Sequence, residues 1–230
     1  MFSSKSIFAT ALLAISALAA PVTPTCSTEK AIMALPDSQT LLAKQSGPPS
    51  FALLGVGVQN YTCGADGKFA SAGAVAELFD ISCLAGKPAF NTVQDTAMRV
   101  WSTIPDRIFS SKLAPLITAP LGCLSAGKHY FTKNAAGGIS PVWDMRTTGL
   151  KSVQGKAGAY VLAAKVANIP APTGAQDVDW LQLKNVEGQL ATAIYRTDTR
   201  GGPAPASCTA GQTLSVKYTS KYFLFGSTVA

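Results

Sequence analysis

Short runs of β-branched, aromatic and small residues dominate the chain, and where their polarity alternates they predict strands. Residues 51–63 form the first run, in which Gly55 and Gly57 indicate a bulge or a close backbone approach. Further strands are predicted at 75–83, 129–132, 141–145, 159–166 and 213–225, with a hairpin at 178–186 and 189–197 around Glu187-Gly188. Many short strands between Gly and Pro turns predict a mainly β fold, either an antiparallel sandwich or a barrel-like domain.

One segment has the helical period instead. Its apolar side chains recur at steps of three and four residues, interrupted by Pro105; they are Phe90, Val93, Ala97, Val100 or Trp101, Ile104 and Ile108. We therefore expect one helix within an insertion around residues 88–118, inside a single β-rich domain of residues 51–230. Residues 20–50 are rich in Pro and Thr at first and end in Gly47-Pro48-Pro49, which predicts an extended N-terminal arm.

The N-terminus has the three parts of a secretory signal peptide. Lys5 supplies the positive region, Ile7 to Leu18 form the apolar run, and Ala17-Leu18-Ala19 offers small residues for cleavage after Ala19. The apolar run is too short to remain as a permanent membrane span. We expect removal of residues 1–19 and a secreted protein, extracellular or in the cell wall, without a membrane span.

Composition narrows the possible partners. The 230 residues include 19 Lys and Arg against 12 Asp and Glu, and the formal charge of +7 falls to +6 without Lys5. This modest excess would favour an acidic wall polymer or a host surface. The basic residues occur mostly singly, which argues against nucleic-acid binding. We expect the protein to be a monomer.

Five cysteines also fit an oxidising compartment, where two disulfides and one thiol are the default. Any of the five can be left out and the other four can pair in three ways, so sequence allows fifteen arrangements. We favour Cys63 with Cys83, which flank a Gly-rich turn, and Cys26 with Cys208, which would tie the arm to a late loop. Cys123 then stays a free, buried thiol.

Two further features concern modification and metal binding. Asn60-Tyr61-Thr62 is the only glycosylation sequon with a permitted middle residue, and its use requires an exposed Asn60. The cysteines form no CxxC pair, and one histidine is too few for a zinc site of ordinary spacing. We expect no metal and no cofactor.

Several motifs taken together resemble a known family. They are Gly57-Val58-Gln59-Asn60-Tyr61-Thr62-Cys63, Gly127-Lys128-His129-Tyr130-Phe131, Asp179-Trp180-Leu181-Gln182-Leu183, Tyr195-Arg196-Thr197-Asp198-Thr199-Arg200-Gly201-Gly202, Cys208, and Tyr218 to Phe225. They are similar to a family of exported fungal proteins with bacterial relatives, a domain of unknown function whose fungal members are often labelled malate dehydrogenase. The resemblance covers about residues 35 to 225. It implies a secreted, mostly β domain and carries no catalytic residues.

The dehydrogenase label does not agree with the residues. A dinucleotide site needs G-x-G-x-x-G between a strand and a helix. Here Asn60 replaces the third glycine after Gly55 and Gly57, and a Gly-rich turn follows instead of a helix. His129 is the sole candidate for a proton relay, and export removes the protein from the cofactor pool. We conclude that the label is wrong and that the chain is not an NAD-dependent dehydrogenase.

Three aspartates and the single histidine are the candidates for other chemistry. Asp177 and Asp179 lie two apart on one predicted strand, so both face the same side, and Asp144 lies elsewhere. Paired carboxylates can serve a glycosidase, although acids at this spacing also form a solvated strand edge, which we favour. The chain lacks a G-x-S-x-G elbow, and we interpret His129 as structural or surface-exposed.

Aromatic residues offer a second kind of site. Trp143 and Trp180, with Tyr160 and Tyr195, would suit a platform for sugar rings, although core packing explains them equally well. The candidate ligand surface therefore comprises His129, Trp143, Asp144, Asp177, Asp179 and Trp180.

Three functions remain open from the sequence. The first, which we favour, is a secreted or wall-associated domain without catalysis that binds a wall polymer, such as a polysaccharide, or a surface ligand. The second is an exported hydrolase that depends on the three aspartates. The third is a secreted elicitor or virulence factor recognised by a host.

Overall fold

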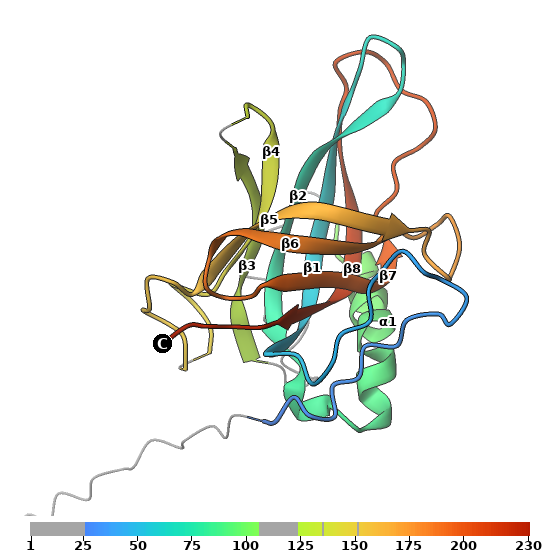
Figure 1. Ribbon diagram of the computed structural model, residues 1–230. Helices are drawn as coiled ribbons and strands as arrows, with labels where there is room; N and C mark the ends of the chain where they lie inside the picture. Colours follow the sequence, from blue (N-terminus) through green and yellow to red (C-terminus); the bar gives the residue numbers. More distant parts are fainter. Residues whose placement is uncertain (1–25, 106–123, 135, 151) are drawn as a thin grey trace, which may run out of the picture.

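Eight antiparallel strands close into a barrel in the computed structural model, which describes residues 26–105, 124–134, 136–150 and 152–230. Each strand pairs with its neighbours along the chain, and the last pairs with the first (Figure 1). The strands are β1 (Phe51–Cys63), β2 (Phe69–Asp80), β3 (Leu124–Lys133), β4 (Ile139–Asp144), β5 (Tyr160–Ile169), β6 (Trp180–Gly188), β7 (Ala193–Gly201) and β8 (Thr213–Phe225). The predicted mainly β fold is confirmed, in its barrel form.

The strand bounds agree best where the sequence pattern is longest. β1 and β8 have the predicted bounds, whereas β2 begins at Phe69, six residues before the predicted start. In the late hairpin, β7 begins at Ala193 rather than residue 189. The reason is that Gln189 and Leu190 leave the hairpin and donate their backbone N–H groups to Gly158 and Tyr160.

Both faces of β1 are buried, which explains its nearly continuous apolar sequence. Odd-numbered residues such as Leu53 join a core inside the barrel to which all eight strands contribute. Even-numbered residues such as Leu54 and Val56 belong to a second core on the outside of the wall. A layer of helix and arm covers this outer face.

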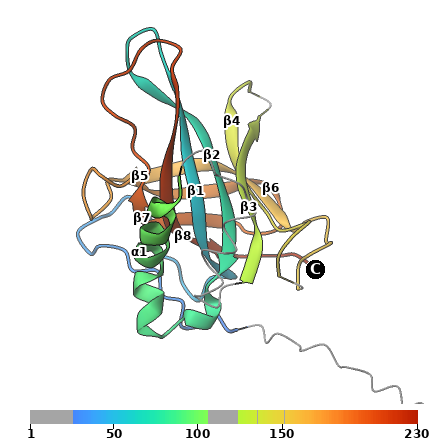
Figure 2. The same cartoon turned by 180° about the vertical axis from the view of Figure 1, so that it is seen from behind.

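The predicted helix is α1 (Pro88–Thr103), which lies against β1, β7 and β8 (Figure 2). Its apolar side, from Phe90 to Trp101, packs on the outer core, and the Trp101 indole donates a 2.9 Å hydrogen bond to the Gly57 carbonyl. Pro105 explains its end, because the residue before proline is driven to an extended conformation. A short 3-10 helix, η1 (Ser82–Leu84), precedes it; residues 106–118 of the predicted insertion lie outside the described residues.

Gly55 and Gly57 mark the predicted close approach. A Cβ atom on Gly55 would lie 2.6 Å from the ring of Tyr222, and one on Gly57 would lie 2.0 Å from the Val75 carbonyl oxygen. The irregularity in register between β1 and β2 lies later, between Gln59 and Tyr61. The two glycines therefore make room inside the barrel, and both lie within a strand rather than at a turn into a helix.

Two disulfides link the four predicted cysteines, but the predicted pairing is wrong: Cys26 bonds to Cys83 and Cys63 to Cys208. Because β1 and β2 are antiparallel, Cys63 lies opposite Phe69 while Cys83 follows the far end of β2. The loop before β8 runs beside the β1–β2 turn, where the Cys208 N–H donates to the Gly67 carbonyl. Spacing along the chain does not contain this information.

Two further predictions concern residues that the structure does not describe. The leader of residues 1–19 and the free thiol at Cys123 lie outside the described residues. Within the described part of the chain, no helix has the length and apolarity needed to cross a bilayer.

Serine substitutions test the pairing. Cys63→Ser with Cys208→Ser removes one bond, which closes a separation of 145 residues, and should lower the free energy of unfolding by about 2 to 5 kcal/mol in urea titrations. Cys63→Ser with Cys83→Ser should break both bonds and expose two more thiols than the wild type to alkylation after unfolding. If this second variant gained no thiol, the pairing of Cys63 with Cys208 would be refuted.

Candidate functional site

A cavity of about 360 Å³ lies in the barrel, on the side formed by β3 to β7. Its inner end is aromatic: the rings of His129 and Trp143 are stacked with centroids 4.4 Å apart, and the Tyr222 ring lies 5.5 Å from His129. Phe131, 5.5 Å from His129, continues this surface outward. A mostly apolar hollow of this size suits one small molecule.

The wall beside this cavity is incomplete. β4 pairs with β5 only from Val142 to Asp144, so Ile139 to Pro141 have no partner on β5. Figures 1 and 2 show the β3–β4 hairpin standing away from β5 at this level. The cavity is lined by Ile139 and Pro141 and therefore reaches this gap.

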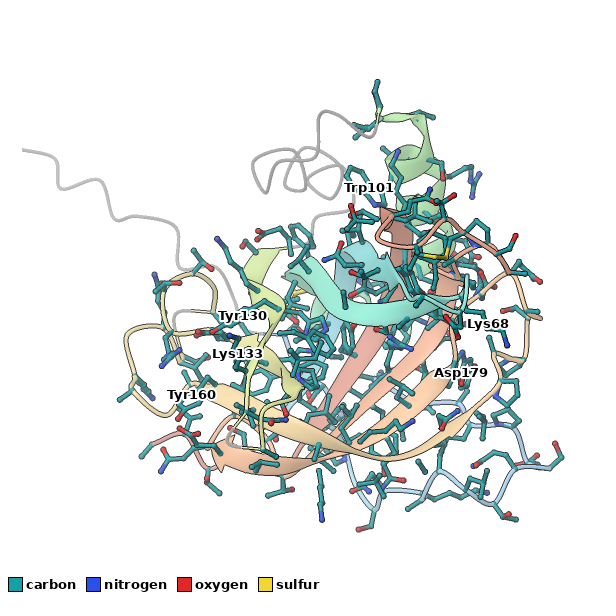
Figure 3. The ribbon with its side chains drawn as sticks, turned by 90° about the horizontal axis from the view of Figure 1, so that it is seen from above. Lys68, Trp101, Tyr130, Lys133, Tyr160 and Asp179 are labelled. Atoms are coloured by element: carbon teal, nitrogen blue, oxygen red, sulfur yellow. A yellow bond between two sulfur atoms is a disulfide. The ribbon has the colours of Figure 1, made fainter. Side chains whose placement is uncertain are left out.

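A second cavity, of about 770 Å³, lies at the barrel mouth. It shares Phe131, Lys165, Leu181 and Arg196 with the inner cavity, so the two meet at a neck formed by these four residues. Seen from above, Lys68 and Asp179, which line the mouth, lie on the same side of the barrel (Figure 3). The inner cavity is thus open to solvent through the mouth.

His129 is a neutral core residue at the inner cavity. It is 3% exposed, and its Nδ1 lies 2.9 Å from the Val142 carbonyl oxygen, which can only accept, so Nδ1 carries the proton. Burial lowers the pKa of His129 to about 3, from an ordinary value of 6.5. Nε2 is therefore an acceptor, and it has no hydrogen-bond partner in the described part of the chain.

Two cations stand at the neck. Arg196 donates from Nε and Nη2 to the Asp179 backbone carbonyl, at 3.1 and 2.8 Å, and Lys165 is exposed. Neither forms an ion pair with a carboxylate among the described residues. Burial raises the pKa of Tyr61 at the mouth, and the charge of Arg196 opposes this rise. Of the four residues that form the neck, two are therefore cationic and none is acidic.

Buried polar atoms without partners in the described part of the chain occur inside the barrel and also outside it, at Trp180 Nε1 and Gln94 Oε1. Trp143 Nε1, Gln59 Nε2 and Ser220 Oγ have none among the described residues. Trp143 lines the inner cavity and Gln59 lines the mouth. A buried donor left unpaired costs about 1 to 3 kcal/mol, so such atoms call for an explanation such as a bound water or ligand.

The predicted ligand surface divides into separate places. His129 and Trp143 line the inner cavity, whereas Asp177 and Asp179 line the mouth. Asp177 accepts hydrogen bonds from Thr173 Oγ1 and the Gly201 N–H, and Asp179 accepts one from Asn168 Nδ2. Both carboxylates therefore hold the loops around the mouth in place.

Asp144 belongs to a different surface. It forms a 2.7 Å ion pair with Arg146 and accepts a hydrogen bond from Tyr130, while Arg146 stacks over Tyr160. Figure 3 places Tyr130 and Tyr160 on the opposite side of the barrel from Asp179. Partial burial acts to raise the pKa of Asp144, but the hydrogen bonds from Arg146 and Tyr130 outweigh it and lower the pKa. Asp144 does not join the other aspartates in one cleft.

The proposed aromatic platform is also dispersed. Trp180 is 6% exposed and belongs to the outer core, away from both cavities. Tyr195 is buried there too, where its hydroxyl donates to the Ala43 carbonyl and accepts from Gln45, which holds the arm against the barrel. Of the four aromatic residues considered, only Trp143 lines a cavity.

The sequon and metal predictions concern the rest of the surface. Asn60 is partly exposed, and its Oδ1 accepts a 2.8 Å hydrogen bond from Ser215 Oγ. Its glycosylation stays a prediction. Within the described ranges, no three His, Cys, Asp or Glu side chains are grouped so that they could hold a metal ion.

Sequence reasoning missed the residues of the neck. In β7, Arg196 is two positions from Ile194, which lies in the inner core, so the alternation of the strand directs it inward as well. The alternation is visible in the sequence around Tyr195-Arg196, but it shows which side chain points inward only when the neighbouring strands are known.

The residues that form the barrel and its cavities match a known protein family. The family model described as Protein of unknown function (DUF3455) matches residues 44–226. The chain belongs to this family. The match runs from the arm to just beyond β8, so the DUF3455 region contains the whole described barrel and both cavities. No curated protein and no solved structure matches the chain.

The low pKa of His129 predicts acid sensitivity. The unfolded chain takes up a proton near pH 6.5 and the folded protein only near pH 3, so stability is present above pH 6.5 and is lost as pH falls toward 3. His129→Asn keeps a donor for the Val142 carbonyl and removes the titration. The free energy of unfolding of the wild type, minus that of the variant, should fall by about 1 kcal/mol per pH unit between pH 6 and 4. A constant difference would show that His129 titrates normally.

Proposed function

We propose that this protein is an exported, non-catalytic binding protein that holds one small ligand inside its barrel. The observation that carries the proposal is the inner cavity, with its aromatic end, unpartnered polar atoms and opening through a cationic neck. Ligand sites in proteins are hollows of this kind, mostly apolar with a few polar groups that fix orientation. The leader sequence and the two disulfides support a location outside the cell, in the wall or at its surface.

A small ligand fits this geometry better than a polymer chain does. Binding of an extended polysaccharide needs aromatic rings along an open surface, whereas Trp143 and Tyr222 lie within the barrel and Trp180 is covered. A hydrolase receives no support either. Asp144 accepts a hydrogen bond from Tyr130, which lies across the barrel from Asp179 in Figure 3. The carboxylates of Asp177 and Asp179 accept hydrogen bonds from Gly201 of β7 and Asn168 of β5.

A neutral fluorescent probe tests the proposal. N-phenyl-1-naphthylamine should bind the protein without its leader and gain fluorescence, because the cavity is apolar. Ala163→Leu, which adds side-chain volume at the cavity, should weaken probe binding at least about tenfold. The matched control is Val166→Leu, at a 52% exposed position on the same strand, which should bind as the wild type does.

A second variant and a second assay complete the test. If Ala163→Leu failed to fold, Leu181→Phe at the neck would serve as the blocking change, since Leu181 is only partly buried. Absence of probe binding by the folded wild type would contradict the proposal. If the protein were retained on chitin, β-glucan or pectin and Leu181→Phe did not change this retention, the polymer function would be favoured instead.

A further inference from the structure

The charges at the neck indicate what one end of a ligand carries. Lys165 and Arg196 both line the inner cavity, and no carboxylate is found among the described residues that line it. Asp177 and Asp179 line the mouth instead, where their oxygens accept hydrogen bonds from Thr173, Gly201 and Asn168. Arg196 donates two hydrogen bonds to a backbone carbonyl, which carries no negative charge to neutralise the guanidinium group. An anionic group at the neck would meet two cations.

The inner end has different requirements. His129 presents Nε2 as an acceptor and Trp143 holds Nε1–H as a buried donor, both without partners among the described residues. Trp143 Nε1 has almost no accessible surface, so His129 Nε2 is the polar atom that the inner end offers to a ligand. A hydroxyl group can donate to this acceptor, which a carbonyl cannot, and it brings no charge into the buried end as an amine cation would.

Between the two ends the walls are apolar and aromatic. Phe131 and Leu181 at the neck and Tyr222 farther in provide ring faces and aliphatic surface. Rings on such surfaces prefer offset or edge contacts with other rings, which a flat aromatic molecule provides.

We propose that the ligand is a planar aromatic molecule with a hydroxyl at its inner end and a carboxylate at the neck, that is, a hydroxyaryl carboxylic acid. In this arrangement the carboxylate contacts Arg196 and Lys165, and the hydroxyl donates to Nε2 of His129. The inference rests on the proposed function, because it assumes that the barrel holds a small ligand.

Four probes test the two ends separately by calorimetric titration of the protein without its leader. 4-Hydroxycinnamate carries both groups, its methyl ester lacks the charge, cinnamate lacks the hydroxyl, and N-phenyl-1-naphthylamine lacks both oxygen groups. We expect 4-hydroxycinnamate to bind at least about tenfold more tightly than its ester, since a hydrogen bond to a charged group is worth about one such factor. It should bind about fivefold more tightly than cinnamate, since the hydrogen bond to the neutral His129 is worth less.

Variants of the neck identify the cations. Arg196→Gln should weaken binding of 4-hydroxycinnamate about tenfold and leave the ester and the neutral probe unaffected, whereas Arg196→Lys should restore most of the preference. Lys165→Gln, at an exposed position, should act in the same direction and serves if Arg196→Gln does not fold. Lys184→Gln removes the same charge from an exposed position of β6 that lines neither cavity and should change nothing.

The outcomes separate the two proposals. If none of the four probes bound, the proposed function would fail, and this inference with it. If the neutral probe bound while 4-hydroxycinnamate bound no more tightly than its ester or cinnamate, the ligand class would be wrong and the binding function would stand. Equal binding of 4-hydroxycinnamate by wild type, Arg196→Gln and Lys165→Gln would also overturn the inference.

Discussion

The pairing of β1 with β8 is the contact on which the rest of the structure depends. The two strands run side by side without interruption from Phe51 opposite Leu224 to Thr62 opposite Thr213, and this pairing closes the barrel. Closure removes the two open edges that an eight-stranded sheet would present to solvent or to other chains. It also makes both strands central, so each is buried on two faces and needs an outer cover. The helix α1 and the arm provide that cover, and the disulfide from Cys26 to Cys83 fastens the arm to the end of β2.

Closure also decides where the interior is full and where it is empty. Around β1, β2 and β8 the ring of Tyr222 fills the space above Gly55, Tyr218 packs with Ala74 and Ala76, and the two tyrosine hydroxyls lie 3.0 Å apart. Burial raises the pKa of Tyr218 well above its ordinary value, so its hydroxyl stays protonated. Toward β4 and β5 the ladder is short and the side chains are smaller, as at Ala163. The cavity is therefore a consequence of unequal filling of one barrel.

The sequence predicted those features that depend on neighbouring residues along the chain. The first and last residues of β1 and β8 were predicted correctly because a sequence pattern of thirteen residues defines each strand. The pairing of Cys63 with Cys208 was missed because it depends on β8 lying beside β1, a contact between the two ends of the domain. Arg196 was missed for the same reason, since a basic residue in an alternating strand shows its side only when the closure of the barrel is known. His129 was interpreted as structural or surface-exposed; it is buried and stacked on Trp143, and it also lines the cavity, which the sequence did not indicate.

Positively charged side chains have different partners in the two cores. In the outer core, Lys221 is 4% exposed, and it lies 3.5 Å from Asp198 and over the ring of Phe90. A buried cation is stable only with such a partner, and the fold supplies one where the surroundings are complete. Inside the barrel, Arg196 has only a backbone carbonyl and Trp143 Nε1 has no partner among the described residues. Apolar side chains in this space would avoid the free-energy cost of unpartnered polar groups and would bury more apolar surface. Unpartnered polar atoms occur on both sides of the wall, since Trp180 Nε1 and Gln94 Oε1 also lack partners among the described residues. What distinguishes the interior of the barrel is therefore the hollow beside its cations, which has no counterpart next to Lys221 in the described part of the chain.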